Sequence, residues 1–386
     1  MRKFYTAEAV TEGHPDKLCD QIADAILDVC LKQDEQSRVA CEVLATKGTI
    51  IVAGEITSTY EPDVFAVVRK VLSDVGYSSE GVTMDTFVHR QSPDIAGAVD
   101  TSKERREGVS DNQMDWFQGA GDQGVMIGYA CDETKQLMPM PVVLANRIVR
   151  ELSACRQSSY IQGILPDGKA QVTVEYENGK PVRLDSVVVS CQHTEDKNLK
   201  KLEAEIRKKV LLPALRLLPP DEDTKIFINP SGRFVCGGMD ADTGLTGRKL
   251  MVDSYGSMVP HGGGAFSGKD CSKVDRSAAY MARYIAKNIV AAGLASKCQV
   301  SLAYAIGVAQ PVMVQVDTFG TGNVCADDCL ELAIPLVFGL TPKQIVDTLR
   351  LTRPIFRQTA AFGHFGRKEF PWEHTDKAEA LRNAVI

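Results

Sequence analysis

Two glycine-rich stretches are the first features of the sequence that could bind a phosphate group. Gly119-Ala120-Gly121-Asp122-Gln123-Gly124 fits the G-x-G-x-x-G pattern, and Gly263-Gly264-Ala265-Phe266-Ser267-Gly268-Lys269 fits the first seven positions of a P-loop. The first lacks the preceding strand and following helix that a dinucleotide site needs, and its aspartate would repel a phosphate. The second has Asp270 where a P-loop carries Ser or Thr, and no apolar strand leads into it.

The second stretch still has the chemistry of an anion site. Four glycines lie between residues 262 and 268, and Lys269 and Lys273 follow closely. Exposed backbone amides beside a lysine attract anions. We therefore predict phosphate binding here rather than a plain turn, in a fold other than that of the P-loop proteins.

Composition limits the class of protein. The 386 residues include 44 Lys and Arg against 50 Asp and Glu, a net charge of −6, and 44% are hydrophobic. These values exclude global disorder and disfavour a dedicated nucleic-acid binder. No apolar run is long enough to span a membrane, and the start does not resemble a signal peptide. Eleven cysteines without a Cys-x-x-Cys predict buried, reduced thiols in a cytoplasmic protein rather than a structural zinc site.

The elements that must position these loops mix helices and strands. Periodicity predicts helices at 16–33, 61–75, 141–155, 196–211 and 275–293, and two more towards the C-terminus. Hairpins are predicted at 39–45 with 49–57 and at 170–176 with 182–190, and single strands at 83–88, 125–130, 300–306 and 312–318. Because hairpins outnumber β-α-β crossovers, we expect an α+β fold with antiparallel or mixed sheets. Residues 97–118 are polar and lack periodicity, so they are either a lid or disordered.

Taken with Glu12-Gly13-His14-Pro15-Asp16-Lys17, these loops resemble methionine adenosyltransferase, also called S-adenosylmethionine synthetase. The resemblance covers nearly the whole chain, with its motifs in family order. Further matching motifs are Gly54-Glu55-Ile56-Thr57, Gln91-Ser92-Pro93-Asp94-Ile95, Phe227-Ile228-Asn229-Pro230-Ser231-Gly232-Arg233-Phe234, Thr246-Gly247-Arg248-Lys249, Ser272-Lys273-Val274-Asp275-Arg276-Ser277, Tyr304-Ala305-Ile306-Gly307-Val308-Ala309 and Gly363-His364-Phe365-Gly366-Arg367.

The resemblance implies three similar α/β domains with a pseudo-threefold relation, although no repeat is visible in the sequence. The boundaries that we expect are an N-terminal domain at 1–93, a mobile lid at 94–118, a central domain at 119–232, a C-terminal domain at 233–374 and a tail at 375–386. In the family the chain crosses between domains, so these limits are approximate. The resemblance also implies a homodimer with active sites between the subunits, often paired into a homotetramer, and no nucleic-acid or membrane partner.

The implied reaction is attack by the sulfur of L-methionine on C5′ of ATP, which expels triphosphate that is then hydrolysed to pyrophosphate and phosphate. Because sulfur needs no general base, positioned cations should dominate catalysis. The residues that match the family's catalytic set are His14, Lys169, Arg248 and Lys269. Those that match its ATP-binding set are His14, Asp167, Lys169, Arg233, Phe234, Asp242, Arg248, Lys249, Ala265, Lys269 and Ile306.

The family's metal and methionine ligands are matched as well. Asp16 and Asp275 match carboxylates linked to Mg²⁺, with two ions per site, and Glu42 matches the residue that holds K⁺. The competing interpretations are helix N-capping for the two aspartates and an ordinary outward strand residue for Glu42. Taken alone, Phe234 and Ile306 would be core residues. The methionine-binding set is Glu55, Gln91, Asp122, Asp242 and Lys273.

The sequence departs from the family pattern in three places, at 238–242, at 160–168 and in the length of the lid region 97–118. Two other functions compete with the one implied. A kinase-like or hydrolytic ATPase would use Lys269 as a P-loop lysine, which Asp270 argues against. A non-catalytic subunit of the same fold would be expected to lack charged site residues, and none of the key ones is missing.

Overall fold

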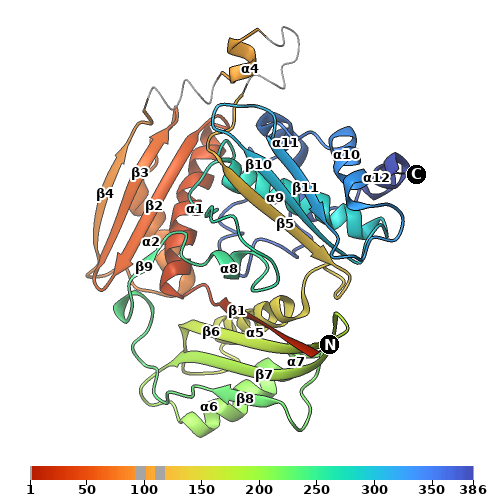
Figure 1. Cartoon of the computed structure of the whole chain (residues 1–386). Coiled ribbons are helices and arrows are strands. Elements are labelled where there is room, and N and C mark those ends of the chain that lie inside the picture. The colour runs from red at the N-terminus through yellow and green to blue at the C-terminus, as the bar shows by residue number, and fades with distance from the viewer. Residues whose placement is uncertain (1, 93–100, 109–117, 386) are drawn as a thin grey trace.

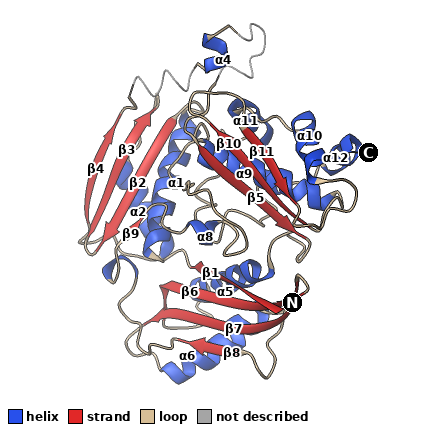
Figure 2. Ribbon diagram, viewed as in Figure 1, coloured by secondary structure: helices blue, strands red, loops and turns tan. Residues whose placement is uncertain are grey.

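The protein contains three β-sheets, each covered by helices (Figures 1 and 2). The computed structural model describes residues 2–92, 101–108 and 118–385. Two sheets have four strands and one has three, in the described residues. Antiparallel pairs predominate, with parallel pairs between β3 and β4 and between β7 and β8. The predicted α+β class with mixed sheets is confirmed.

The sheet that lies beside the candidate site has the strand order β4-β3-β2-β9. The predicted hairpin is present, with Thr46 opposite Thr49 across its turn. Helix α1 packs against this sheet and against α2, and is buried along most of its length. The elements of this unit are α1 (Pro15–Gln33), β2 (Arg38–Thr46), β3 (Thr49–Thr57), α2 (Val64–Val75), β4 (Thr83–His89) and β9 (Gly244–Leu245).

The second sheet, β1-β6-β7-β8, takes its edge strand from the start of the chain. Strand β1 pairs with β6, more than 150 residues away, with Val10 opposite Lys169. The predicted hairpin around Asn178-Gly179 is confirmed. The elements are β1 (Arg2–Val10), α5 (Met140–Gln157), β6 (Ile164–Glu177), β7 (Lys180–His193), α6 (Leu199–Ile206), a π-helix (Arg207–Leu211), α7 (Leu212–Ala214) and β8 (Lys225–Ile228).

The third sheet, β11-β10-β5, is antiparallel and packs against the buried helix α9. The C-terminal helices pack against α9 and β11 at one side of this sheet (Figure 1). The elements are β5 (Gly124–Cys131), α9 (Val274–Ala291), β10 (Lys297–Tyr304), β11 (Met313–Asp317), α10 (Asp327–Val337), α11 (Pro342–Leu349) and α12 (Ala378–Val385), with a 3₁₀ turn at Pro371–Glu373. The 3₁₀ turn Gly238–Asp240 contacts β2, and α8 (Leu250–Asp253) contacts β1.

Capping residues explain two helix starts that differ from the prediction. Helix α2 begins at Val64 because the Asp63 side chain accepts the Ala66 N–H at 2.9 Å. Helix α6 begins at Leu199, where Asn198 accepts the Lys201 N–H at 3.0 Å. Side-chain oxygens at these positions satisfy backbone donors that the first helical turn leaves unpaired.

The predicted loop 97–118 lies partly outside the described residues. Its described part, 101–108, contains the short helix α4 (Lys103–Arg106), which the lack of periodicity did not indicate. The Glu104 carboxylate accepts the backbone N–H of Ala309 at 2.9 Å and that of Gln310 at 3.3 Å. The Lys103 N–H donates to the Gly307 carbonyl at 2.8 Å. Contacts with a distant turn hold this helix, and local periodicity could not reveal them.

The cysteines form no disulfide bonds, and most of them are buried. All eleven cysteines are free thiols; eight are buried, Cys325 is half-buried, and Cys236 and Cys329 are exposed. Within the described ranges, no single helix is long and apolar enough to cross a membrane; α10 and α11 meet that criterion only together, with a 76° bend between them.

Candidate active site

Helix α1 presents four aspartates at every fourth position, and each one fixes a loop from another part of the chain. Asp16 accepts the backbone N–H of Leu245, Asp20 that of Gly247, and Asp24 that of Gly268, at 2.8–3.0 Å. Asp28 accepts the N–H groups of the 356–357 turn, both at 2.9 Å. Four residues of helix rise about 6 Å. The loops of residues 245–249 and 262–269 therefore lie side by side along α1.

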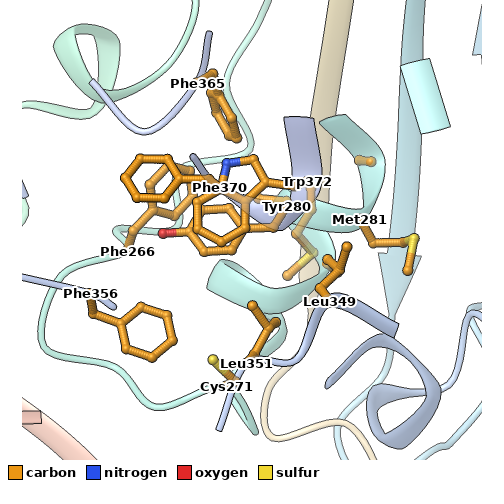
Figure 3. Close-up of a cluster of buried hydrophobic side chains, with 14 of the residues drawn as sticks. Phe266, Cys271, Tyr280, Met281, Leu349, Leu351, Phe356, Phe365, Phe370 and Trp372 are labelled. Atoms are coloured by element: carbon orange, nitrogen blue, oxygen red, sulfur yellow. The ribbon is translucent and has the colours of Figure 1, made fainter. Parts of the chain in front are cut away.

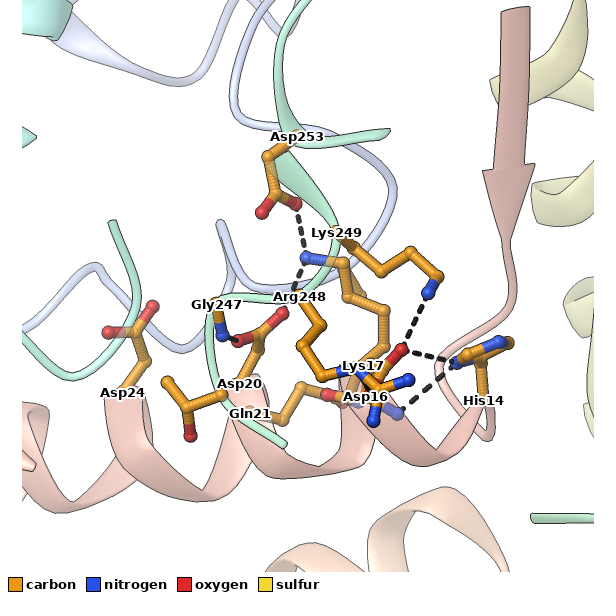
Figure 4. A network of polar contacts seen from close by, with 12 residues as sticks. His14, Asp16, Lys17, Asp20, Gln21, Asp24, Gly247, Arg248, Lys249 and Asp253 are labelled. Carbon is orange, nitrogen blue, oxygen red and sulfur yellow. Dashed lines mark hydrogen bonds and ion pairs between the residues drawn. The ribbon is translucent and has the colours of Figure 1, made fainter. Parts of the chain in front are cut away.

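The N-terminal end of α1 collects the first group of predicted site residues (Figure 4). Lys249 Nζ lies 2.5 Å from Asp16 Oδ2, and Arg248 Nε lies 3.5 Å from Asp16 Oδ1. Burial alone would raise the pKa of Asp16, but the hydrogen bond and charge of Lys249 bring it below the ordinary value. Asp16 is thus ionised and buried, and both cations, Arg248 and Lys249, lie at its carboxylate.

His14 stands at the edge of this group as a neutral hydrogen-bond donor. It is the N-cap of α1, and its Nδ1 accepts the Asp16 N–H at 3.2 Å. Burial, and then the positive charge of Lys249, lower the pKa of His14 to about 4. Lys169 contributes to the same lowering, so its charge also reaches the imidazole. Because Nδ1 accepts, the proton of the neutral ring resides on Nε2, which can donate to a ligand.

The glycine-rich loop is held rigidly. Phe266, in its middle, is 3% exposed and packs into an aromatic cluster with Tyr280, Phe365 and the ring of His364, at centroid distances of 4.9–6.0 Å (Figure 3). Gly268 has φ +81°, and a Cβ there would lie 2.0 Å from the Cys41 carbonyl oxygen. Only glycine fits such a close backbone approach. The backbone amides of the loop are therefore fixed in position before an anion binds.

Lys269 and Asp275 form the second group of site residues. Lys269 Nζ lies 2.6 Å from Asp275 Oδ2, and a Cβ at Gly264 would lie 2.2 Å from Asp275 Oδ1. Glu42 is exposed on β2, where partial desolvation raises its pKa and the charge of Lys269 opposes that rise. Gly247 and Ala265 touch, since a Cβ on the glycine would lie 2.7 Å from that of Ala265. This contact joins the second group to the first.

Asp270, which occupies the P-loop hydroxyl position, has a structural role. Its buried carboxylate accepts the N–H groups of Val39 at 2.7 Å and Ser272 at 2.9 Å, and it pairs with Lys273. Burial would raise the pKa of Asp270, but the charges of Lys273 and then Arg38 lower it. Asp270 therefore anchors the loop to β2.

Three further predicted residues flank the His14 side of the site. Asp167 is buried and accepts the Gly238 N–H at 2.8 Å; burial raises the pKa of Asp167 to about 6, and the charge of Asp242 adds to the effect. Lys169 pairs with Glu8 of the neighbouring strand β1. The segment 238–242, where the sequence departs from the family pattern, begins with the 3₁₀ turn Gly238–Asp240, whose first residue is bound by Asp167.

The other predicted residues do not pair with the cations of these two groups, although Glu55 and Asp122 adjoin the second group. Glu55 lies opposite Ala40 of β2, which bridges Lys269, and Gly121, next to Asp122, donates its N–H to the Ser272 carbonyl at 3.2 Å. Glu55 faces His89 at 3.6 Å, and the Gln91 N–H donates to Thr57 Oγ1 at 3.3 Å. Arg233 pairs with Glu195 at 2.7 Å, and Asp122 is exposed. Phe234 is half-buried and Ile306 is 46% exposed, so the interpretation of these two as core residues is wrong.

The capping interpretation of the two metal-site aspartates is also wrong. His14 caps α1, and Asp16 is the second residue of that helix. Helix α9 has Lys273 at its N-cap position without a side-chain capping bond, and the Asp275 carboxylate pairs with Lys269 instead. Both carboxylates are thus directed toward cations across the site rather than toward their own helix ends.

Sequence reasoning missed Asp20, Asp24 and Asp28. The spacing of the aspartates at four-residue intervals was a signal of their role. Like charges at this spacing destabilise a helix, so they indicate partners elsewhere in the chain. Asp24 is the clearest example. It forms a bidentate pair with the fully buried Arg276, at 2.8 and 2.6 Å.

Comparison with protein-family models accounts for almost the whole chain. The N-terminal domain of S-adenosylmethionine synthetase matches residues 2–96, the central domain matches 117–234, and the C-terminal domain matches 236–374. The chain belongs to the S-adenosylmethionine synthetase family. It is accordingly a methionine adenosyltransferase, an enzyme of the transferase class that synthesises S-adenosylmethionine.

The donor set of this synthetase suits a hard cation such as Mg²⁺, although the described residues contain no group of three or more His, Cys, Asp or Glu that could hold a metal alone. Asp16 and Asp275 supply carboxylate oxygens, each now paired with a lysine. Mg²⁺ commonly binds through one or two carboxylates plus substrate phosphates. The carboxylates therefore fit a cation that arrives with a polyphosphate.

Proposed function

We propose that this site binds the triphosphate of ATP between the two groups of cations and transfers the adenosyl group to L-methionine. The supporting observation is that Arg248, Lys249 and Lys269 lie on adjoining loops fixed along one buried helix. Arg248 and Lys249 lie against Asp16, and Lys269 lies against Asp275, so three cations are available to a polyanion that brings a metal ion for the two carboxylates. Positioned cations stabilise a leaving group more strongly than mobile ones, since no reorganisation is needed.

In the proposed step, the sulfur lone pair forms the bond to C5′ while the C5′–O bond breaks and its electron pair leaves with the triphosphate. The Nε2–H of neutral His14 donates to the leaving oxygen as negative charge develops there. Arg248 offers two parallel donors to a phosphate, and Lys249 and Lys269 act as point charges. Water then cleaves the triphosphate, held by the same cations, to pyrophosphate and phosphate.

The ion requirement belongs to the same proposal. Asp16 and Asp275 would hold Mg²⁺ against the phosphates, and Glu42 would hold K⁺ near Lys269. When bound, Mg²⁺ would neutralise phosphate charge. In its absence each carboxylate pairs with a lysine, so binding the metal with the polyphosphate would release Lys249 and Lys269 toward the phosphate oxygens.

We further propose that Glu55, Gln91 and Asp122 complete a methionine site across the interface of a homodimer. The Glu55 side chain is 42% exposed and Asp122 is exposed in the single chain, as expected of side chains that a second subunit would face. The test mixes two inactive variants, Lys249→Met from the first group and Glu55→Gln from beside the second. If each site draws residues from both subunits, the mixed dimers should regain activity that neither parent has. Mixed dimers without regained activity would contradict a shared site.

The decisive assay for the reaction incubates the protein with ATP, L-methionine, Mg²⁺ and K⁺. S-adenosylmethionine, pyrophosphate and phosphate should form in equal amounts, and a quenched single turnover should show triphosphate before pyrophosphate. ADP as the nucleotide product would overturn the proposal in favour of phosphoryl transfer. Omission of methionine separates the two cases, because an ATPase would continue without it.

A further inference from the structure

A buried lysine next to the site residues has no role in the reaction described above. Lys17 follows Asp16 in α1, and its side chain is completely inaccessible to solvent. Its ammonium lies 2.9 Å from Asp20 Oδ2 and contacts Asp253 Oδ1 (Figure 4). One buried cation between two buried carboxylates costs more solvation energy than an apolar contact of the same size. Stability alone is therefore a weak reason for this arrangement.

The two carboxylates contact the two ends of the segment 247–253, which carries Arg248 and Lys249. Asp20 accepts the Gly247 N–H at 2.9 Å, just before Arg248. Asp253 ends α8, and its own N–H donates to the Lys249 carbonyl at 2.9 Å. Lys17 thus links the start of the turn, through Asp20, to its end, through Asp253. The buried His364 ring also faces Asp253, with Nε2 3.7 Å from Oδ1. A buried polar network of this kind restricts the turn to few geometries.

We propose that Lys17 and Asp253 are positioning residues that hold Arg248 and Lys249 at the distance a triphosphate requires. Neither side chain can reach a ligand, because both are buried behind the turn. They act through the backbone of residues 247–249. This inference rests on the proposed function for the identity of the polyanion, but the geometry concerns any triphosphate at this site.

The test compares Asp253→Ala, Asp253→Asn and a matched control, Glu175→Ala. Glu175 is an equally buried carboxylate paired with Arg2 and Arg183 in the sheet of β1, β6 and β7. Isothermal titration with magnesium tripolyphosphate measures binding directly, and initial rates give kcat and the KM for methionine. Thermal unfolding reports stability for each variant.

Asp253→Ala should weaken tripolyphosphate binding and lower kcat by about 10- to 100-fold, the usual effect of displacing a catalytic contact by an ångström. The KM for methionine should change less than about twofold, because the proposed methionine residues Glu55, Gln91 and Asp122 lie on other segments. Asp253→Asn keeps an oxygen that can accept from Lys17 and should restore most of the binding. Glu175→Ala should lower only the unfolding temperature.

Unchanged tripolyphosphate binding in folded Asp253→Ala would overturn the inference, as would an equal loss in Glu175→Ala. Should Asp253→Ala fail to fold, Lys17→Met/Asp253→Leu, which removes one charge of each sign, takes its place with the same expected result. A wild-type protein that binds tripolyphosphate but makes no S-adenosylmethionine would refute the proposed function alone, since the binding comparison among the variants would still decide the role of Asp253.

Discussion

Replacement of Lys269 by methionine should nearly abolish turnover while leaving the glycine-rich loop in place. The loop does not depend on the lysine side chain: Arg276 Nη1 donates to the Lys269 carbonyl at 2.9 Å, and Gly268 N–H is held by Asp24. The substitution therefore removes one charge that faces the leaving triphosphate. Loss of one such preorganised contact typically lowers kcat by about 10²–10³, or about 2.7–4 kcal/mol.

The expected stability change is much smaller than the catalytic one. The Lys269 side chain is 23% exposed and its pair with Asp275 is partly solvated, so the pair contributes at most about 1 kcal/mol to folding. The control is Lys70→Met, which breaks an exposed lysine–aspartate pair on α2, remote from the site.

The assay is the initial rate of S-adenosylmethionine formation at saturating ATP and methionine, together with thermal unfolding. Lys269→Met should lose the stated factor in kcat with a smaller change in the KM for methionine, and Lys70→Met should match the wild type. Near-normal turnover in a folded Lys269→Met protein would refute the assigned role. A large loss of unfolding temperature would instead show that the pair with Asp275 supports the fold.

Three further outcomes test other parts of the argument. Glu42→Gln should weaken activation by K⁺ in a titration of initial rate without abolishing the reaction; an unchanged K⁺ response would remove the assignment. Glu104→Ala should speed tryptic cleavage within α4 and lower kcat, with ATP plus methionine protecting the wild-type protein, if the segment is a lid; parental turnover would favour a loop without a role. Burial raises the pKa of Asp28 from 3.8 to about 6. The shift makes the free energy of unfolding about 3 kcal/mol larger below pH 4 than above pH 6, at 1.36 kcal/mol per pKa unit. This contribution is fully present below pH 4 and is lost as the pH rises through 6. The stability advantage of the wild type over Asp28→Asn should therefore fall between pH 4 and 7 in paired thermal scans, and a constant difference would contradict the raised pKa.

Local patterns in the sequence were sufficient for the hairpins and the long helices. The hairpin of β2 and β3 and the one around Asn178-Gly179 follow from alternation and turn residues, which act between neighbours in the chain. The motifs also identified the membership of the S-adenosylmethionine synthetase family, while anion binding by the glycine-rich loop stays a prediction. These features depend on residues close in sequence, so they could be read without coordinates.

Tertiary structure alone decided which distant segments meet. Strand β1 pairs with β6 across more than 150 residues, and α4 is held by the backbone of residues 309 and 310. Neither contact leaves a local pattern. The same holds for the site: the sequence shows Asp16, Asp20, Asp24 and Asp28 four residues apart, but not which loop each one holds. A buried carboxylate must find donors, yet only the packing of the sheets against α1 determines whose backbone supplies them.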